Sequence, residues 1–152
     1  MEHANTSMNS RKNRTYIGGG TFSANPLTMS AGDATLNVLK SKKSSLYKKL
    51  DGLGKDTVKM LSKVFSNDVI VTGKGSLFMT HFPKDGMTEI TNAEDAAKCD
   101  SKKLFNYHFE MIARNGIFFL PGKLGAFSDA HSSSDVKDMK KASESFVSSL
   151  KR

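Results

Sequence analysis

Cysteine, tryptophan and proline are scarce in this sequence of 152 residues, which has one cysteine, no tryptophan and three prolines. Cys99 has no second cysteine to pair with, so an internal disulfide is excluded and a reducing, cytoplasmic compartment is expected. Long hydrophobic runs are absent too. No segment approaches the roughly 20 apolar residues of a membrane span, and the polar start lacks the pattern of a signal peptide.

Motifs of well-known chemistry are also missing. The glycine-rich stretch at residues 18–20 is not followed by the Gly-Lys-Ser/Thr of a P-loop, and it lacks the Gly-x-Gly-x-x-Gly spacing of a dinucleotide fold. No His/Cys cluster has the spacing of metal ligands, and no Ser-His-Asp arrangement is evident. The sequence therefore predicts no metal site and no catalytic residue within this chain.

Acidic residues are outnumbered, and the net charge is +8 with a pI near 9.6. A net positive charge of this size suggests nucleic acid as a binding partner. However, the excess is mostly lysine, scattered along helices rather than interleaved with aromatic residues, which is typical of a solvated face. These features weigh against nucleic acid. A stand-alone basic module that binds a phosphorylated ligand or nucleic acid stays open as the alternative function.

The stretch at residues 18–27 is the most informative part of the chain. Its three glycines allow positive φ angles and close approach of a ligand. Asn25 has the character of a helix N-cap, and Pro26 suits the first helical turn. A glycine-rich turn that opens a helix can bind an anion, because free N–H groups and the helix dipole favour negative charge. An ordinary turn and cap is the alternative.

The hydrophobic pattern after this turn predicts alternating groups of helices and short strands. Residues 1–17 form a basic lead-in without hydrophobic period. Helices are expected at residues 26–39, 46–65, 93–114 and 135–150, and strands at 69–71, 76–82, 117–120 and 126–130. The apolar run 117–120 is typical of a strand covered on both faces. The fold class is therefore α+β: a mostly antiparallel sheet of about four strands covered by helices.

Three polar residues within these elements, which could be mistaken for catalytic or ligand residues, are expected to have structural roles or to be solvated. His108 lies on the apolar face of its helix and is expected to be a hydrogen-bonded core histidine, and His81 is expected to be a packed or edge side chain. Lys74, in a turn between two glycines, is expected to be solvated and therefore a poor nucleophile. The first helix differs, since it is apolar on two sides and one side needs a partner.

Residues 19–32, Gly-Gly-Thr-Phe-Ser-Ala-Asn-Pro-Leu-Thr-Met-Ser-Ala-Gly, resemble a segment of the class-III pyridoxal-phosphate (PLP) aminotransferases, in the form closest to glutamate-1-semialdehyde 2,1-aminomutase. In that family the threonine and its neighbouring backbone reach the cofactor phosphate of the other subunit of a dimer. The resemblance implies that Gly20 and Thr21 are cofactor-binding residues. Ala24 is the one departure, because the family usually has glycine there.

The similarity continues to the C-terminus through three further segments, at residues 74–78, 114–121 and 127–136. It implies the small C-terminal domain of a fold-type I PLP enzyme, preceded by a linker helix. The domain organisation expected from it is a flexible basic lead-in at 1–17, the phosphate-contact turn and linker helix at 18–40, and the small α+β domain at 41–152.

The resemblance also implies what this chain does not carry. In the family, the lysine that binds the cofactor covalently and the acid that pairs with its pyridine nitrogen lie upstream, in a large domain. The chain is thus expected to be a C-terminal portion of an aminomutase or aminotransferase, inactive alone. Its expected partners are that large domain, a second subunit and an amino-acid or semialdehyde substrate. The substrate is open, because the shortened loop at Leu124-Gly125-Ala126 lacks the glutamate of the aminomutase.

Overall fold

The computed structural model describes residues 20, 24–66, 68–84 and 86–150, and divides the chain into two compact units at residues 1–42 and 43–152. In the first unit, α1 (Pro26–Ser41) is the helix expected after the glycine-rich stretch. Asn25 caps it as predicted: its side-chain Oδ1 accepts the N–H of Thr28 at 3.0 Å, and Pro26 occupies the first turn. None of the residues of α1 is buried.

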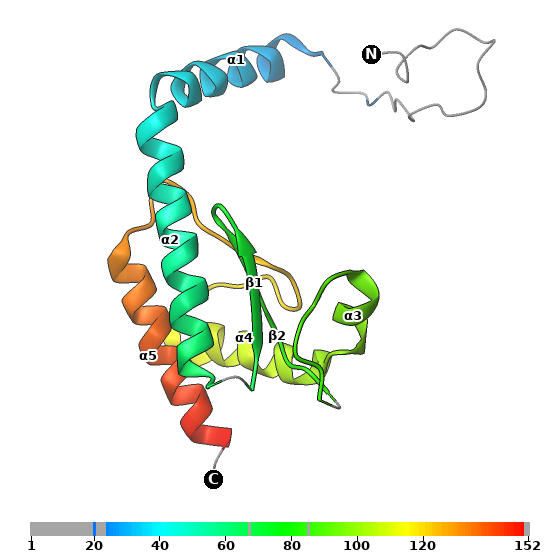
Figure 1. Cartoon of the computed structure of the whole chain (residues 1–152). Coiled ribbons are helices and arrows are strands. Elements are labelled where there is room, and N and C mark those ends of the chain that lie inside the picture. The colour runs from blue at the N-terminus through cyan, green and yellow to red at the C-terminus, as the bar shows by residue number, and fades with distance from the viewer. Residues whose placement is uncertain (1–19, 21–23, 67, 85, 151–152) are drawn as a thin grey trace, which may run out of the picture. The chain divides into compact units, whose positions relative to one another are not determined.

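The second unit contains the other elements (Figure 1). They are α2 (Lys43–Val64), β1 (Ile70–Lys74), β2 (Leu77–His81), α3 (Ala93–Lys98), α4 (Ser101–Asn115), β3 (Gly125–Ala126) and α5 (Ser133–Leu150). The strands form an antiparallel sheet in the order β1-β2-β3. The α+β class is confirmed, with three strands in the described residues where about four were expected.

One face of the sheet packs against α2. Thr80 and Phe78 of β2 are buried on this inner face, opposite Val71 and Gly73 of β1. Two glycines make the approach close: a Cβ at Gly54 would lie 1.8 Å from the Gly75 carbonyl oxygen. A Cβ at Gly73 would lie 2.7 Å from the Val58 side chain. Helix α2 therefore packs against the β1–β2 hairpin at glycine positions, where a Cβ would not fit.

The core lies between this inner face and the helices α2, α4 and α5, and it is rich in aromatic rings. The ring of Tyr107 on α4 lies 5.1 Å from that of Phe146 on α5 and 5.4 Å from that of Phe65 after α2. Such edge-to-face pairs add about 0.5–1.5 kcal/mol each beyond the area they bury. Leu61 and Met111 are fully enclosed beside them.

The expected helix 93–114 is wrong as a single element, because it is divided at Cys99 and Asp100. The Asp100 carboxylate accepts the N–H groups of Lys102 and Lys103, which makes it the N-cap of α4. The Asp100 N–H donates to the Phe82 carbonyl at 2.8 Å, so the start of α4 is tied to the end of β2. Helix α4 ends at Asn115, next to the expected residue 114, and Gly116 is its left-handed cap with φ 64°.

The expected strand at 117–120 is also wrong. This segment forms no strand, and its side chains alternate: Phe119 is buried, whereas Phe118 and Leu120 are 78% and 59% exposed. The physical reason is that Phe119 turns inward, where it stacks on His108 and meets the edge of Phe78, while Ile117 is only partly buried against the core. Of the last predicted strand, 126–130, only Ala126 lies in a strand, which is β3 (Gly125–Ala126).

The turn predicted at residues 72–75 is shorter than expected. Strand β1 continues to Lys74, and Gly75 and Ser76 alone form the turn. Gly75 has φ 61°, the left-handed region that two-residue hairpin turns require and glycine favours. The Ser76 carbonyl then accepts the N–H of Phe127, which joins the hairpin tip to the end of β3.

Candidate functional site

The predicted phosphate contact of Gly20 and Thr21 stays a prediction, because the structure describes Gly20 but not Thr21. Gly20 is exposed. Thr21 lies outside the described residues, and its role stays a prediction. No other residue of the glycine-rich stretch before Ala24 is described.

Ala24 offers a physical reason for the glycine that the resembled family has at this position. Its φ is 58°, in the left-handed region that costs an L-residue with a Cβ roughly 1–2 kcal/mol. The chain therefore keeps a turn geometry suited to glycine although alanine stands there. The turn leads directly into the Asn25 cap.

The N-terminus of α1 uses its own hydrogen-bond donors. Pro26 has no N–H, the Thr28 N–H donates to the Asn25 side chain, and the Met29 N–H donates to the Asn25 carbonyl. An anion at this helix end would compete with these internal partners. The N-terminus of α1 is therefore an ordinary helix cap, the alternative named from the sequence. A phosphate contact would have to come from the residues before Ala24.

The two-sided apolar character expected for α1 is present as exposed surface. Leu27, Met29, Leu36 and Val38 are between 52% and 80% exposed. Single exposed apolar residues are common on protein surfaces, but four on one helix of 16 residues are not.

The segment at 128–135, which carries part of the family resemblance, forms a local capping structure. The His131 Nδ1 accepts the backbone N–H of Ser128 at 3.0 Å and lies 3.0 Å from the Ser128 hydroxyl. The Asp135 carboxylate accepts the N–H and hydroxyl of Ser132, and these bonds lower its pKa. The carboxylate is thus engaged by Ser132, and no hydrogen bond joins it to His131 in the part of the chain described, so these residues do not form a catalytic triad.

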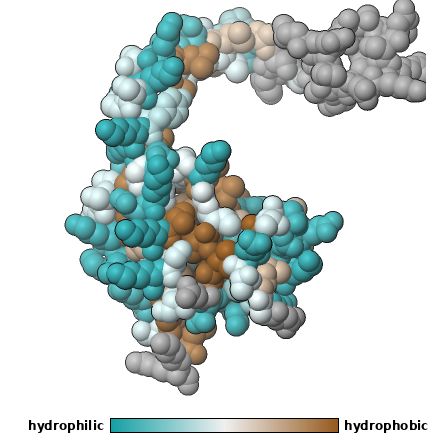
Figure 2. Space-filling view, in the orientation of Figure 1, coloured by the Kyte–Doolittle hydropathy of each residue, from teal (hydrophilic) through white to brown (hydrophobic). Residues whose placement is uncertain are grey.

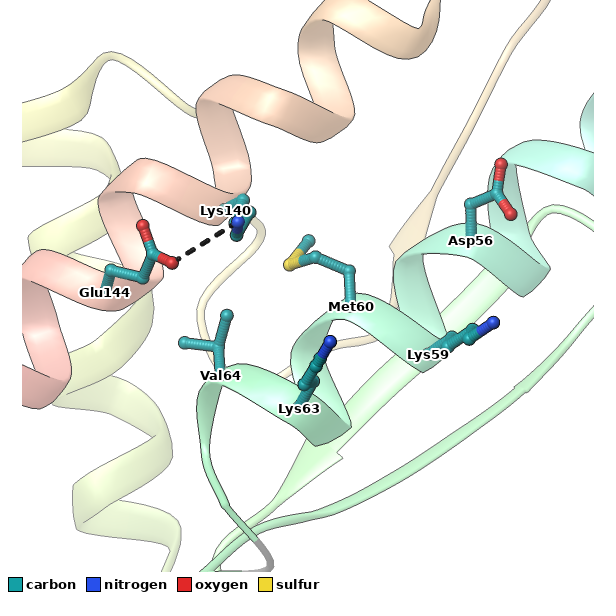
Figure 3. A pocket seen from close by; sticks show the side chains of 7 residues that line it. All are labelled: Asp56, Lys59, Met60, Lys63, Val64, Lys140 and Glu144. Carbon is teal, nitrogen blue, oxygen red and sulfur yellow. Dashed lines mark ion pairs between the residues drawn. The ribbon is translucent and has the colours of Figure 1, made fainter.

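A cavity of about 420 Å³ lies between α2 and α5 (Figure 3). Met60 and Val64 supply its apolar side chains, and Lys59, Lys63 and Lys140 surround them with charge. Lys140 pairs with Glu144 at 3.6 Å, and both side chains are more than half exposed. An exposed pair of this kind contributes little, and the residues around it form an ordinary solvated helix face.

A second cavity, of about 350 Å³, lies on the face of the sheet opposite α2, here named the outer face. Its apolar lining includes Leu77, Met79, Ile90 and Leu124. Figure 2 shows apolar side chains gathered over the β1–β2 hairpin. The polar pair in this cavity is Thr72 and His81, whose hydroxyl and Nε2 lie 2.9 Å apart. Burial lowers the pKa of His81, so the expected packed histidine is confirmed.

The lysine and cysteine side chains that could act as nucleophiles lie in surroundings that do not activate them. Every lysine in the described ranges is exposed, including Lys74, as the sequence predicts. Burial raises the pKa of the Cys99 thiol, which makes it a weaker nucleophile. Among the residues with described positions, no group of three or more His, Cys, Asp or Glu side chains is placed to bind a metal ion.

His108 is a second buried histidine whose partner the sequence did not identify. It is 2% exposed, and its Nδ1 accepts the N–H of Gly122 at 3.2 Å. The expectation of a hydrogen-bonded core histidine is confirmed. The partner was missed because a backbone donor in a loop has no sequence signature.

None of the helices described is long and apolar enough to cross a membrane. No protein-family profile matches this chain. It is nevertheless similar to the glutamate-1-semialdehyde 2,1-aminomutase of Methanocella arvoryzae, with 32% identity over 139 residues, which cover 87% of this chain and 31% of that protein. The aminomutase of Clostridium beijerinckii is 33% identical over 145 residues, which cover 90% of this chain and 33% of that protein. The chain spans about a third of the length of these curated relatives.

Solved structures with a similar fold include an omega-transaminase from Sphaerobacter thermophilus, with a TM-score of 0.64 and 25% identity over 86% of this chain and 29% of that one. A beta-phenylalanine aminotransferase from Variovorax paradoxus has a TM-score of 0.68 and 23% identity over 90% of this chain and 31% of that one. The second likeness concerns the fold alone.

Proposed function

We propose that this chain, a C-terminal portion of a glutamate-1-semialdehyde 2,1-aminomutase-like class-III aminotransferase, serves PLP-dependent amino-group transfer as the small domain of a larger enzyme. The single observation that carries the proposal is the 32% identity to an aminomutase over 139 residues. In this enzyme PLP supplies the electron-withdrawing ring that makes amino-group transfer possible.

Gly20 and Thr21 are the proposed contacts of this chain with the cofactor phosphate, which would belong to the other subunit of a homodimer. The exposed backbone of Gly20 fits such a role, and Ala24 retains the left-handed turn that separates this segment from α1. The described residues fit one phosphate contact but not a complete cofactor site, because all their lysines are exposed. The covalent lysine and the acid for the pyridine nitrogen are proposed to lie in the large domain.

The domain roles follow from this assignment. Residues 18–40 are proposed as the phosphate-contact turn and linker helix, residues 41–152 as the small domain, and residues 1–17 as a basic lead-in. The substrate is proposed to be an amino acid or a semialdehyde. Leu124 lies in the loop where the aminomutase resemblance predicts an acid, so a related aminotransferase substrate is the alternative.

A chimaeric enzyme tests the proposed function. The corresponding C-terminal part of the Methanocella arvoryzae relative is replaced by residues 18–152, and PLP retention and amino-group transfer are measured. Thr21→Ala is expected to weaken PLP retention about tenfold or more, since a charge-assisted hydrogen bond to phosphate contributes about 1.5–3 kcal/mol. Ser23→Ala, which removes a neighbouring hydroxyl, is the matched control.

Two results would count against the proposal. Unchanged PLP retention in Thr21→Ala would remove Thr21 from the site. Borohydride trapping of PLP in stoichiometric amount on one lysine of the isolated chain would contradict the assignment of the covalent lysine to another domain. Tight binding of nucleic acid by the isolated chain would instead support the stand-alone basic module.

A further inference from the structure

His108 of α4 holds the loop that follows α4 at two points. Its Nδ1 accepts the Gly122 N–H at 3.2 Å, and its ring stacks on Phe119 with the centroids 4.6 Å apart and the planes 12° apart. Because Nδ1 accepts, the proton of the neutral ring lies on Nε2. One buried side chain thus contacts both the start and the middle of residues 119–124.

Gly122 is shaped to receive these contacts. Its φ of 72° favours glycine, and a Cβ there would lie 3.0 Å from the ring of Phe105, one helical turn before His108. The Lys123 N–H donates to the Leu120 carbonyl at 2.9 Å and closes a tight turn. The turn therefore lies directly on the Phe105 and His108 side of α4.

The loop carries Leu124 to the cavity on the outer face of the sheet. Leu124 lines this cavity together with Leu77 and the Thr72–His81 pair. Beyond it the chain is fixed independently, because Gly125 pairs with Phe78 of β2 and a Cβ at Gly125 would lie 2.3 Å from the Phe78 ring. Among the described residues, His108 is the side chain that accepts a hydrogen bond from the backbone between Phe119 and Gly125.

We propose that His108 is a positioning residue for the loop at residues 120–124, and that its hydrogen bond with Gly122 sets where Leu124 lines the outer-face cavity. The hydrogen bond requires an unprotonated Nδ1, so the loop is held only while His108 is neutral. The consequence for substrate choice rests on the proposed function, whereas the positioning concerns contacts within this chain.

The surroundings of His108 keep it neutral near pH 7. Burial lowers its pKa to about 4, and the neighbouring Tyr107, with a pKa raised to about 12 by its own burial, is uncharged. On α4, Glu110 pairs with Arg114 at 3.1 Å. Lys123, the charged residue of the loop, is exposed.

Two variants of the 152-residue chain separate positioning from simple packing. His108→Asn keeps a neutral acceptor near the place of Nδ1, whereas His108→Leu keeps apolar volume without an acceptor. The measurement is the hydrogen-exchange protection of the Gly122 amide by NMR. The control is the Phe127 amide, which donates to the Ser76 carbonyl rather than to a group of the 120–124 loop.

We expect His108→Leu to lower the protection of Gly122 at least about tenfold and to shift the Leu124 methyl resonances, while Phe127 protection is unchanged. His108→Asn should restore most of the protection. In the wild type, protection of Gly122 should disappear as the imidazole protonates, and in His108→Asn it should persist through the same pH range. Unchanged Gly122 protection in His108→Leu, or an equal loss at Phe127, would overturn the proposal.

If His108→Leu does not fold, a pH titration of the wild-type chain tests the proposal instead. The protonation of His108 is followed by its imidazole nitrogen shifts. Loss of Gly122 protection in step with protonation supports the proposal, and protection that survives protonation overturns it. Neither result depends on PLP or on amino-group transfer, so failure here is distinguishable from failure of the proposed function.

Discussion

The hydroxyl groups of Tyr107 and Ser143 lie 2.7 Å apart in the core, where α4 meets α5. The Ser143 hydroxyl donates to the Met139 carbonyl of its own helix at 2.8 Å, so the Tyr107 hydroxyl is the donor between the two side chains. Both residues are fully buried. This hydrogen bond therefore fixes how α4 and α5 align, in a contact that is otherwise made by aromatic rings.

Ser143→Ala should destabilise the chain by about 1–3 kcal/mol, because the buried Tyr107 hydroxyl then loses its acceptor. Tyr107→Phe combined with Ser143→Ala should cost less than the sum of the two single changes, since both partners are then removed. Urea unfolding of the three variants measures this coupling. Strict additivity would contradict a hydrogen bond between the two side chains.

Gly54→Ala should destabilise the domain by about 1–3 kcal/mol or more, because the new Cβ would meet the Gly75 carbonyl oxygen 1.8 Å away. Gly52→Ala in the same helix is the matched control. A Cβ at Gly52 meets nothing within 4 Å, so this change should stabilise α2 by about 0.5–1 kcal/mol. Opposite signs in thermal unfolding are expected, and equal signs would contradict the close approach of α2 to the hairpin.

Ala24→Gly should stabilise the start of α1 by roughly 1 kcal/mol, because glycine adopts the observed φ of 58° without strain. Ala31→Gly, in the exposed interior of the same helix, should weaken it by a similar amount. Amide exchange at Thr28 and Met29 compares the two. A weaker helix in Ala24→Gly would argue against the left-handed turn.

The stability of the chain should fall between pH 6.5 and about 4. Burial lowers the pKa of both His81 and His108, so in this range the unfolded chain binds protons that the native state does not. The contribution is fully present above pH 6.5 and is lost as the pH falls toward 4; the loss from His108 is at most about 3 kcal/mol, and His81 adds to it in the same direction. Urea unfolding at pH 7.5, 5.5 and 4.5 tests it, and His108→Asn should flatten the dependence.

The exposed apolar residues of α1 should cause self-association or local fraying. Burial of such side chains contributes roughly 1.5–3 kcal/mol each, which favours contacts with a second molecule. Leu27→Gln with Leu36→Gln should reduce association in sedimentation experiments, whereas Lys40→Gln on the same helix should not. A clean monomer with strongly protected α1 amides would favour the stand-alone module over the proposed enzyme.

Local signals in the sequence predicted much of the fold. Asn25 caps α1, as its side chain and the following Pro26 predict. The long helices α2 and α5 follow from apolar spacing, since each buries one face. Such features depend on neighbours in the chain and are therefore visible without tertiary structure.

The errors arose where tertiary contacts decide the structure. The apolar period continues through Asp100, but its carboxylate and N–H are both used to start a new helix. Phe118 and Phe119 are identical in the sequence, yet only Phe119 finds ring partners inside. For the candidate site, the turn and cap were predictable, whereas the His108–Gly122 bond joins residues that no local pattern connects.

The packing of α5 has a consequence for protein synthesis. Val136, Met139 and Phe146 of this helix complete a core whose other members come from α2, β2 and α4. Ribosomes deliver these earlier elements first, and domains fold as units. Until α5 emerges, the Tyr107 hydroxyl lacks its Ser143 partner and the Tyr107 and Phe65 rings lack Phe146, so the nascent chain exposes an aromatic surface that chaperones can recognise.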